Sequence, residues 1–377
     1  MIHLLHSVDT LRLENGGLPL AVSELCSALA TSDSPTSSPK VTLLTHPSQS
    51  TWQPAPQVHL QQTQSWHATL SKLHAHQKLK LIHQHGIWVR SSHTTCNFAQ
   101  QQKLPIVLSP HGMLEPWALQ HHAWRKKIAL ALYQKNHLKR ATALHATSEA
   151  EAQQLRDLGL TQPIAIIANG VQLPDPEDPP PPHQGSTTRH ALFLSRLHPK
   201  KGIPMLLQAW AQLKLPDWQL TIAGNDEAGH LAELKQQVQQ LNITSTLTFT
   251  GPLYGEAKER AFQQAELFIL PSHSENFAIV IAEALAHGLP VITTRETPWQ
   301  SLEQHQCGWW VEAQSETIAH ALKNATTLSP AKLQAMGQRG KTLVSEKFHW
   351  PNIAKQMLSY YHWLIDEQAS TRPDFVI

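Results

Sequence analysis

The sequence predicts an α/β protein built from two parallel-sheet domains. Its 377 residues exceed one domain of ordinary size. Short apolar runs, typical of buried strands, alternate with helix-compatible segments in both halves of the chain. Between the halves, residues 174–186 are rich in proline and cannot form helix or sheet. We therefore expect a first domain over 1–172, a linker over 173–189, a second domain over 190–350 and a terminal helix within 351–377.

Composition excludes some classes of function. Hydrophobic residues make up 41% of the chain, enough for full cores, and a net charge of +2 gives no general electrostatic case for nucleic acid. Charged residues are few, at 15%, whereas there are 25 histidines. We interpret these histidines as surface polar residues, so mild acid is expected to raise the positive charge of the protein sharply.

Cysteine usage and hydropathy indicate the compartment. Cys26, Cys96 and Cys307 are far apart and odd in number, which favours neither a disulfide framework nor a CxxC metal site. The first residues lack the features of a signal peptide, and no apolar run is long enough to span a bilayer. We expect a cytoplasmic protein, at most attached peripherally to the inner face of the cytoplasmic membrane.

A glycine pair follows the first predicted strand, residues 2–8. Gly16 and Gly17 precede a predicted helix over 18–30, and such a turn suits close approach by a phosphate or a sugar. Simple turn chemistry is the alternative, and the absence of GxGxxG argues against a standard dinucleotide site. Further strands are expected at 40–45, 79–84, 105–109, 143–147 and 163–167, and helices near 65–78 and 87–102.

Two more features of the first half invite a functional interpretation. His111 directly follows the strand 105–109, where it either meets a substrate hydroxyl or a developing charge, or is an ordinary turn residue. Residues 121–140 form a predicted basic helix that includes Arg125, Lys126 and Lys127. It either lies against anionic lipid headgroups or an anionic acceptor, or presents a solvated face. Further on, Ser148 is a predicted helix N-cap with Glu151 as its capping-box partner.

After the linker the alternation of strands and helices restarts. The strand 191–194 leads to a loop with Arg196 and Lys201, two cations that suit a diphosphate but are also compatible with an ordinary surface. Strands are then expected near 218–223, 246–250, 266–270 and 290–294, and helices near 203–213, 229–241, 255–264, 277–287, 315–325, 330–347 and 351–368.

Two carboxylates interrupt the apolar stretch 271–290. Glu275 lies in the loop after the strand 266–270, at the edge of the sheet where open α/β folds bind ligands. Glu283 lies within an apolar helix, where His287 is its one local partner. Because a buried carboxylate without a partner is costly, we expect ligand hydroxyls or a backbone amide elsewhere to meet it. Two domains around a hinge also predict a cleft between them.

These residues resemble a known family. Glu275 and Glu283 follow the Glu-x7-Glu pattern of retaining nucleotide-sugar glycosyltransferases with the GT-B fold, the large bacterial family four. Residues 195–202 are similar to its arginine-lysine pair, and 272–292 to its donor-site signature. Residues 110–117 and 146–151 match a subgroup associated with surface polysaccharide and lipopolysaccharide assembly. The resemblance covers nearly the whole chain and implies two Rossmann-like domains that face across a cleft.

The resemblance also implies a role for each site residue. Arg196 and Lys201 bind the diphosphate and stabilise the leaving group, Glu275 meets the hydroxyls of the donor sugar, and Glu283 accepts hydrogen bonds from ribose. Backbone groups at Asn276, Phe277 and Ala278 help to hold phosphate. Gly16 and Gly17 approach the diphosphate and the acceptor, His111 faces the donor sugar, and the last helix packs on the first domain. Two departures from the family pattern are Ala278, where glycine is common, and Ala168, where proline is common.

The implied reaction transfers a sugar from a nucleotide diphosphate to an acceptor hydroxyl with retention, on a glycan or lipid-linked acceptor. No residue stands out as a covalent nucleophile, and no DxD motif is placed to hold a metal, so no metal cofactor is expected. Two alternatives remain: a sugar-nucleotide epimerase on the same fold, and a non-catalytic protein that binds sugar nucleotides or glycans.

Overall fold

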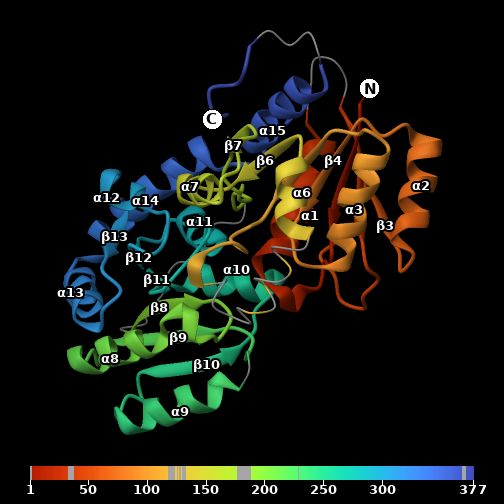
Figure 1. Ribbon diagram of the computed structural model, residues 1–377. Coiled ribbons are helices and arrows are strands. Elements are labelled where there is room, and N and C mark those ends of the chain that lie inside the picture. Colours follow the sequence, from red (N-terminus) through yellow and green to blue (C-terminus); the bar gives the residue numbers. More distant parts are fainter. Residues whose placement is uncertain are drawn as a thin grey trace. The chain divides into compact units, whose positions relative to one another are not determined.

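The computed structural model describes residues 2–32, 38–117, 124, 126, 129, 133–175, 188–227, 229–366 and 371–377. The chain forms two compact units (Figure 1). Unit 1 comprises residues 1–170 and 350–377, and unit 2 comprises residues 171–349. Most of the expected linker, residues 176–187, lies outside the described residues.

Unit 1 is built on a seven-stranded parallel sheet with the order β3-β2-β1-β4-β5-β6-β7. The strands are β1 His3–Val8, β2 Lys40–Thr45, β3 His59–Gln62, β4 Leu81–His85, β5 Ile106–Ser109, β6 Ala143–Ala146 and β7 Ile164–Ile166. The described helices are α1 Gly17–Ala30, α2 Trp66–Gln77, α3 Arg90–Gln101, α6 Lys135–Arg140, α7 Glu149–Asp157 and α15 Trp350–Ile365.

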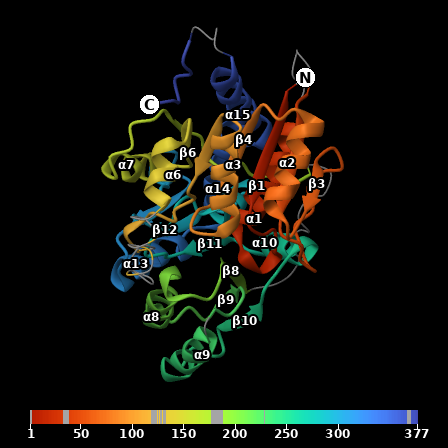
Figure 2. The same ribbon diagram turned by 45° about the vertical axis from the view of Figure 1, so that its right-hand side comes forward.

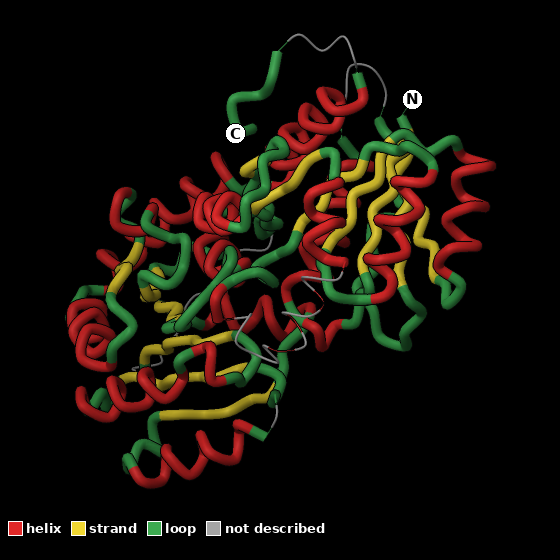
Figure 3. The backbone as a smooth tube through the Cα atoms, viewed as in Figure 1, coloured by secondary structure: helices red, strands yellow, loops and turns green. Residues whose placement is uncertain are grey.

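Alternation along the strands divides the core of unit 1 into two layers. Leu4 of β1 faces the layer that holds α1 and α15, and the next residue, Leu5, faces the layer that holds α2, α3, α6 and α7. Successive side chains of a strand point to opposite faces, so both faces of the sheet need apolar cover. The terminal helix α15 completes one of them, and Figure 3 shows the strands of unit 1 enclosed by helices.

Unit 2 repeats the arrangement with six parallel strands in the order β10-β9-β8-β11-β12-β13. The strands are β8 Arg189–Leu194, β9 Trp218–Ala223, β10 Leu247–Gly251, β11 Leu267–Leu270, β12 Val291–Thr294 and β13 Gly308–Val311. The helices are α8 Ile203–Leu213, α9 His230–Gln240, α10 Gly255–Gln264, α11 Ile279–Ala286, α12 Ser301–Gln304, α13 Ser315–Thr326 and α14 Pro330–Lys347. Helices α8, α9 and α13 cover one side of the sheet, and α10, α11 and α14 cover the other (Figures 1 and 2).

The expected α/β class with two parallel sheets is confirmed, and nearly all expected elements are present within a few residues of their expected ends. Among the described strands and α-helices, three short elements, β3, α12 and β13, were not expected. At α7, the Ser148 hydroxyl caps the helix by accepting a hydrogen bond from the N–H of Glu151, as expected. The Glu151 carboxylate accepts hydrogen bonds from the N–H groups of Thr147 and Gly112.

The interpretation of the histidines as surface residues is wrong for a group of them. Among the residues that the structure describes, seven histidines are buried: His3, His6, His83, His85, His137, His145 and His230. Four of these, on β1, β4 and β6, are at most 2% exposed. Burial disfavours the charged imidazolium and lowers the pKa of these four rings, so the four do not contribute to the rise in charge that was expected in mild acid.

Other expectations concern the surface and the cysteines. Of the basic helix expected over 121–140, Arg125 and Lys127 lie outside the described residues, and Lys126 is partly buried. The three cysteines are free and buried. Among the described helices, none has the length and the apolar character needed to cross a lipid bilayer.

Candidate functional site

The strand order of unit 2 creates a switch point between β8 and β11. From β8 the chain proceeds outward through β9 and β10, and from β11 it proceeds the other way through β12 and β13. The loops that follow β8 and β11 therefore leave neighbouring strands in opposite directions, which opens a crevice at the carboxyl edge of such a sheet. These two loops, residues 195–202 and 271–278, carry most of the predicted site residues.

The two loops are in direct contact. A Cβ atom on Gly202 would lie 1.9 Å from the carbonyl oxygen of Pro271, so this position admits no side chain, and its φ of +67° also favours glycine. The N–H of His273 donates a hydrogen bond of 2.7 Å to the carbonyl of Lys200. Backbone contacts therefore fix the loop after β8 against the loop after β11.

Lys201 and Glu275 form an ion pair at this contact. The Nζ atom of Lys201 lies 2.5 Å from Oε1 of Glu275, and the hydroxyl of Ser272 donates to the same oxygen at 2.7 Å. Both side chains are about a tenth exposed. Burial alone would raise the pKa of the Glu275 carboxyl, but the charge of Lys201 and the hydrogen bonds from Lys201 and Ser272 outweigh it and lower the pKa. The carboxylate is therefore ionised at neutral pH.

Arg196 makes a different contact. Its guanidinium donates a hydrogen bond of 2.8 Å to Glu227, in the loop after β9, and both side chains are about 40% exposed. The structure thus brings Lys201 and Glu275 together and pairs Arg196 with another carboxylate. A guanidinium has five N–H groups, so this contact leaves Arg196 able to donate to a ligand as well.

Glu283 has a protein partner that the sequence analysis missed. The expectation was a ligand hydroxyl or a backbone amide, whereas Lys258 of α10 lies 2.6 Å from Oε1 of Glu283. Both side chains are about 85% buried. His287, the expected local partner, instead donates through Nδ1 to the main-chain carbonyl of Glu283 and contacts Glu259 through Nε2.

Both site carboxylates share one feature. In Glu275 and in Glu283, a lysine holds Oε1, and Oε2 makes no hydrogen bond with any described residue. An ionised carboxylate only accepts hydrogen bonds, so a ligand that meets these open oxygens must supply donors. Hydroxyl groups of a sugar or a ribose are such donors.

The start of α11 lies between these carboxylates in sequence. Ala278 is the N-cap residue and has φ +60°, a left-handed conformation that glycine adopts far more easily. Phe277 is buried, and its carbonyl accepts a hydrogen bond of 2.6 Å from the indole of Trp299. Asn276, beside it, is partly buried. This anchoring holds the backbone that leads into the helix N-terminus, where free N–H groups favour an anion.

Unit 1 has its own switch point, between β1 and β4. Gly16 has φ +77° and caps α1, whose first residue is Gly17, so the glycine pair lies at a helix N-terminus after β1. His111 follows β5 and also has positive φ, +54°. The N–H of the next residue, Gly112, donates to Glu151 at 2.7 Å, which fixes the loop that carries the His111 side chain.

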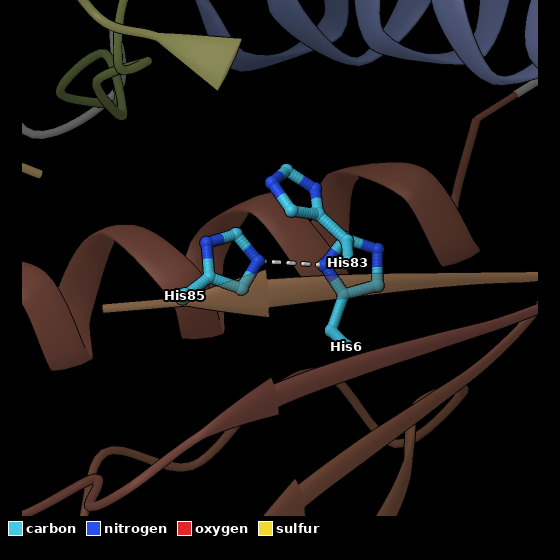
Figure 4. Close-up of side chains that lie close together, drawn as sticks. All are labelled: His6, His83 and His85. Carbon is cyan, nitrogen blue, oxygen red and sulfur yellow. Dashed lines mark hydrogen bonds between the residues drawn. The ribbon is translucent and has the colours of Figure 1, made fainter. Parts of the chain in front are cut away.

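A network of buried histidines lies under His111. His6 contacts His85 at 3.0 Å, and His85 contacts His111 at 3.0 Å through its other ring nitrogen (Figure 4 shows the first contact). A second branch joins His83 to Ser109 at 2.6 Å and Ser109 to His145 at 2.7 Å. Because the rings occupy the interior of the sheet, burial lowers the pKa of His6 to about 3 and of His145 to about 4.

Three of these rings are close enough to share a metal ion. The nearest ligand atoms of His6, His83 and His85 lie within 4.8 Å of one another, the single such group among the described residues. Their geometry fits a hydrogen-bond network better. His6 and His85 bond to each other, and both nitrogens of His83 are bonded, to Tyr361 and Ser109. A metal ion would have to replace these bonds, and no carboxylate joins the three rings to balance its charge.

Comparison with known proteins places this geometry in a family. Residues 175–343 match the model of the "glycosyl transferases group 1" family, and residues 20–170 match that of the "glycosyl transferase 4-like domain". Together the two models account for most of the chain. Each half of the chain thus resembles a glycosyltransferase domain. The two Rossmann-like parallel sheets are those of the GT-B fold.

Similar proteins support the family and the fold. An uncharacterised glycosyltransferase of Methanocaldococcus jannaschii is 29% identical over 174 residues, which cover 45% of this chain and 44% of the relative. The chain thus spans under half the length of that curated relative. Sucrose-phosphate synthase from Thermosynechococcus elongatus superposes with a TM-score of 0.78 at 22% identity, over 97% of this chain and 99% of that one. Anabaena HepE, in complex with UDP and glucose, gives 0.75 at 18% identity over 96% and 99%.

Proposed function

We propose that this protein is a glycosyltransferase that moves a sugar from a nucleotide diphosphate to an acceptor hydroxyl, with retention at the anomeric carbon. The observation that carries the proposal is the Lys201–Glu275 pair at the switch point of unit 2. It offers a cation for a diphosphate and, 2.5 Å away, a carboxylate with one oxygen open to a hydroxyl donor. The UDP and glucose complex of Anabaena HepE supports a nucleotide-sugar donor.

Each predicted site residue of unit 2 has a role in this proposal. The ammonium of Lys201 has three N–H groups, so it can keep Glu275 and still donate to phosphate. Arg196 adds a second cation, and the N-terminus of α11 at Asn276, Phe277 and Ala278 adds backbone donors. The open oxygen of Glu275 accepts from the hydroxyls of the sugar, and that of Glu283 accepts from those of the ribose.

Unit 1 contributes groups that suit the diphosphate, the donor sugar and the acceptor. Gly16 and Gly17 permit close approach to the diphosphate and the acceptor because neither has a side chain. His111 contacts the donor sugar as a neutral ring, since burial and the neighbouring His145 lower its pKa to about 3. A neutral imidazole has one donor and one acceptor nitrogen, which suits a hydroxyl.

The proposed reaction follows a front-face course. The bond from the anomeric carbon to the phosphate oxygen breaks, and a bond from the same carbon to the acceptor oxygen forms on the same face. The acceptor proton passes to the departing phosphate. Lys201 and Arg196 stabilise the charge that develops on that phosphate, an electrostatic contribution of about 3 kcal/mol for one preorganised group.

The two cations also bear on metal use. We propose that Lys201 and Arg196 serve the diphosphate without a metal cofactor, because they supply the positive charge that Mg²⁺ often provides. Sugar transfer at an unchanged rate in excess chelator is the expected result. A rate that falls with chelator and recovers with Mg²⁺ would reject this part of the proposal.

The acceptor and its location are proposed from the motifs of unit 1. Residues 110–117 and 146–151 favour a glycan or lipid-linked acceptor in surface-polysaccharide or lipopolysaccharide assembly. We place the protein in the cytoplasm, with peripheral membrane contact through Arg125, Lys126 and Lys127. Sedimentation of the protein with anionic liposomes should decrease when these three residues are neutralised. Unchanged sedimentation would reject the proposed membrane contact.

A binding screen comes first because it identifies the nucleotide base and the sugar of the donor. Thermal unfolding is measured with UDP-, GDP- and ADP-sugars, since a bound ligand stabilises the fold by mass action. The donor that raises the melting temperature is then used with glycan acceptors, and release of the nucleoside diphosphate is followed. Release that depends on the acceptor supports glycosyl transfer.

Glu275→Gln tests the site directly. We expect kcat/KM to fall about 100-fold, because the neutral amide weakens both the Lys201 contact and the contact with the sugar. Glu266→Gln is the matched control: Glu266 pairs with Arg189 at 2.8 Å and is 18% exposed, at the opposite end of the same two strands. Undiminished turnover in Glu275→Gln would reject the site.

The two alternative functions give different outcomes in the same assays. An epimerase would convert the donor sugar without any acceptor. A binding protein would be stabilised by a donor but would release no nucleotide with any acceptor. Either result would replace the transferase proposal.

A further inference from the structure

A chain of three histidines leads from the interior of unit 1 to His111. The Nδ1 atom of His6 lies 3.0 Å from Nε2 of His85, and Nδ1 of His85 lies 3.0 Å from Nε2 of His111. Successive rings are stacked, with interplanar angles of 16° and 27°. In Figure 4 the dashed line joins His6 on β1 to His85 on β4, the two strands that flank the switch point.

The two ends of this chain differ. At the inner end, Nε2 of His6 is buried and has no hydrogen-bond partner in the described part of the chain. At the outer end, His111 is partly buried, and its Nδ1 makes no hydrogen bond with any described residue. The outer nitrogen is therefore the one that a ligand can meet.

All three rings are neutral. Burial and the neighbouring His145 lower the pKa of His6 and of His111 to about 3. Burial, with His6 and His111 nearby, holds the pKa of His85 well below 6.5. A neutral imidazole carries one N–H and one acceptor nitrogen, so each ring can donate through one nitrogen and accept through the other, and His85 does both.

This restriction couples the tautomers. If His111 carries its proton on Nδ1, its Nε2 must accept from Nδ1 of His85. His85 then accepts through Nε2 from His6, which must also carry its proton on Nδ1. The reverse case places all three protons on Nε2. The three rings therefore carry their protons on the same nitrogen, and a change in one requires a change in all.

We propose that His85 and His6 are positioning residues for His111: they fix its ring orientation and set whether Nδ1 offers a donor or an acceptor to the sugar. The inference rests on the proposed function, in which His111 contacts the donor sugar. The branch through His83 and His145 bonds to Ser109 and not to His111.

Nitrogen NMR of the histidine rings is the first test and needs no substrate. Two-bond proton–nitrogen spectra of histidine-labelled wild-type protein distinguish the two neutral tautomers, and the signals of His6, His85 and His111 are assigned from single variants. We expect one shared tautomer in all three rings. A different tautomer in His111 and His85, or averaged nitrogens in His111, would overturn the coupling.

Variants give the second test. His85→Phe keeps a stacked ring but deletes both hydrogen bonds. We expect averaged His111 nitrogens and a kcat about 10-fold to 100-fold lower, since small misplacements of contact groups reach that size. His85→Asn, whose amide reaches the position of Nδ1, should recover part of the loss. Wild-type NMR signals of His111 together with wild-type kcat in His85→Phe would contradict the proposal.

The inner position has a matched control on the same strand. His6→Phe should lower kcat by less than His85→Phe, because one ring separates it from His111. His3→Phe deletes a buried hydrogen bond of 2.9 Å to Thr42 at the other end of β1 and should leave kcat unchanged. Equal losses of kcat in His6→Phe and His3→Phe would reject a specific role for His6. If wild-type protein transfers no sugar, the proposed function fails, while the NMR result still decides the coupling.

Discussion

The two units place different chemistry at the same position of similar folds. Each has a parallel sheet whose strand order reverses direction once, and in each the polar side chains gather near that point. In unit 2 these are ion pairs, Lys201–Glu275 and Lys258–Glu283. In unit 1 they are neutral histidines joined by hydrogen bonds. Topology thus determines where a site lies, and the side chains decide whether it acts through charge or through neutral hydrogen bonds.

The largest expected difference between the two units is their stability in acid. The folded pKa of each buried histidine in unit 1 is below the unfolded value near 6.5, so the unfolded chain binds more protons below that pH. The free energy of unfolding therefore falls as the pH drops from 6.5 toward 4. At about pH 5 each ring lowers the free energy of unfolding by about 2 kcal/mol. The summed loss for His6, His83, His85 and His145 approaches the whole stability of a typical domain.

Hydrogen exchange read by mass spectrometry measures this difference. After correction for intrinsic rates, β1, β4 and β6 should lose protection between about pH 7.5 and pH 5. The strands of unit 2 should keep theirs, because their single histidine, His190 in β8, is only partly buried. Equal losses in both units would contradict the assignment of neutral chemistry to unit 1.

Removing a charge from unit 2 should have a smaller effect, specific to ligand binding. Lys258→Met leaves Glu283 without the group that holds Oε1 in place. We expect the affinity for the nucleoside diphosphate to fall about 10-fold, the size of one charged hydrogen bond. Isothermal titration measures it. The variant Arg260→Gln is the control, because Arg260 lies on the same helix and pairs with an exposed glutamate. Unchanged affinity in Lys258→Met would show that the Lys258–Glu283 pair has no role in ligand binding.

The smallest expected effect concerns backbone strain. Each unit has a non-glycine residue with positive φ in a site loop, His111 at +54° and Ala278 at +60°. Alanine is strained there, so Ala278→Gly should raise the free energy of unfolding by about 0.5–1 kcal/mol, even though glycine gains entropy when unfolded. Urea unfolding measures it. A less stable variant would show that the methyl group contributes packing that outweighs the strain.

The sequence predicted the fold because strands and helices leave local patterns. Loops after β8 and β11 were predicted to carry site residues, and Lys201 of the first loop does pair with Glu275 of the second. The pairing of Lys258 with Glu283 was missed because 25 residues separate them, and only the packing of α10 near α11 joins them. β3 was missed because its sequence, HLQQ, has no β-branched residue.

The histidine network shows a second limit of sequence analysis. Frequent histidine suggested a polar surface, and composition alone does not distinguish a solvated ring from a buried one. The segment His83-Gln84-His85 provided a usable signal, since it continues a buried strand toward a glycine. Whether its rings reach His6 and His111 depends on strand register and on the left-handed turn at His111, neither of which leaves a pattern in the sequence.

The close approach of Gly202 to Pro271 has a consequence for how this protein meets its ligand. The two loops that carry Lys201 and Glu275 are joined through their backbones before any ligand arrives. The conformational entropy of ordering them is therefore lost during folding and does not reduce the affinity for the ligand. A change in donor preference must then come from substituted side chains, because a longer or shorter loop would separate the lysine from the glutamate.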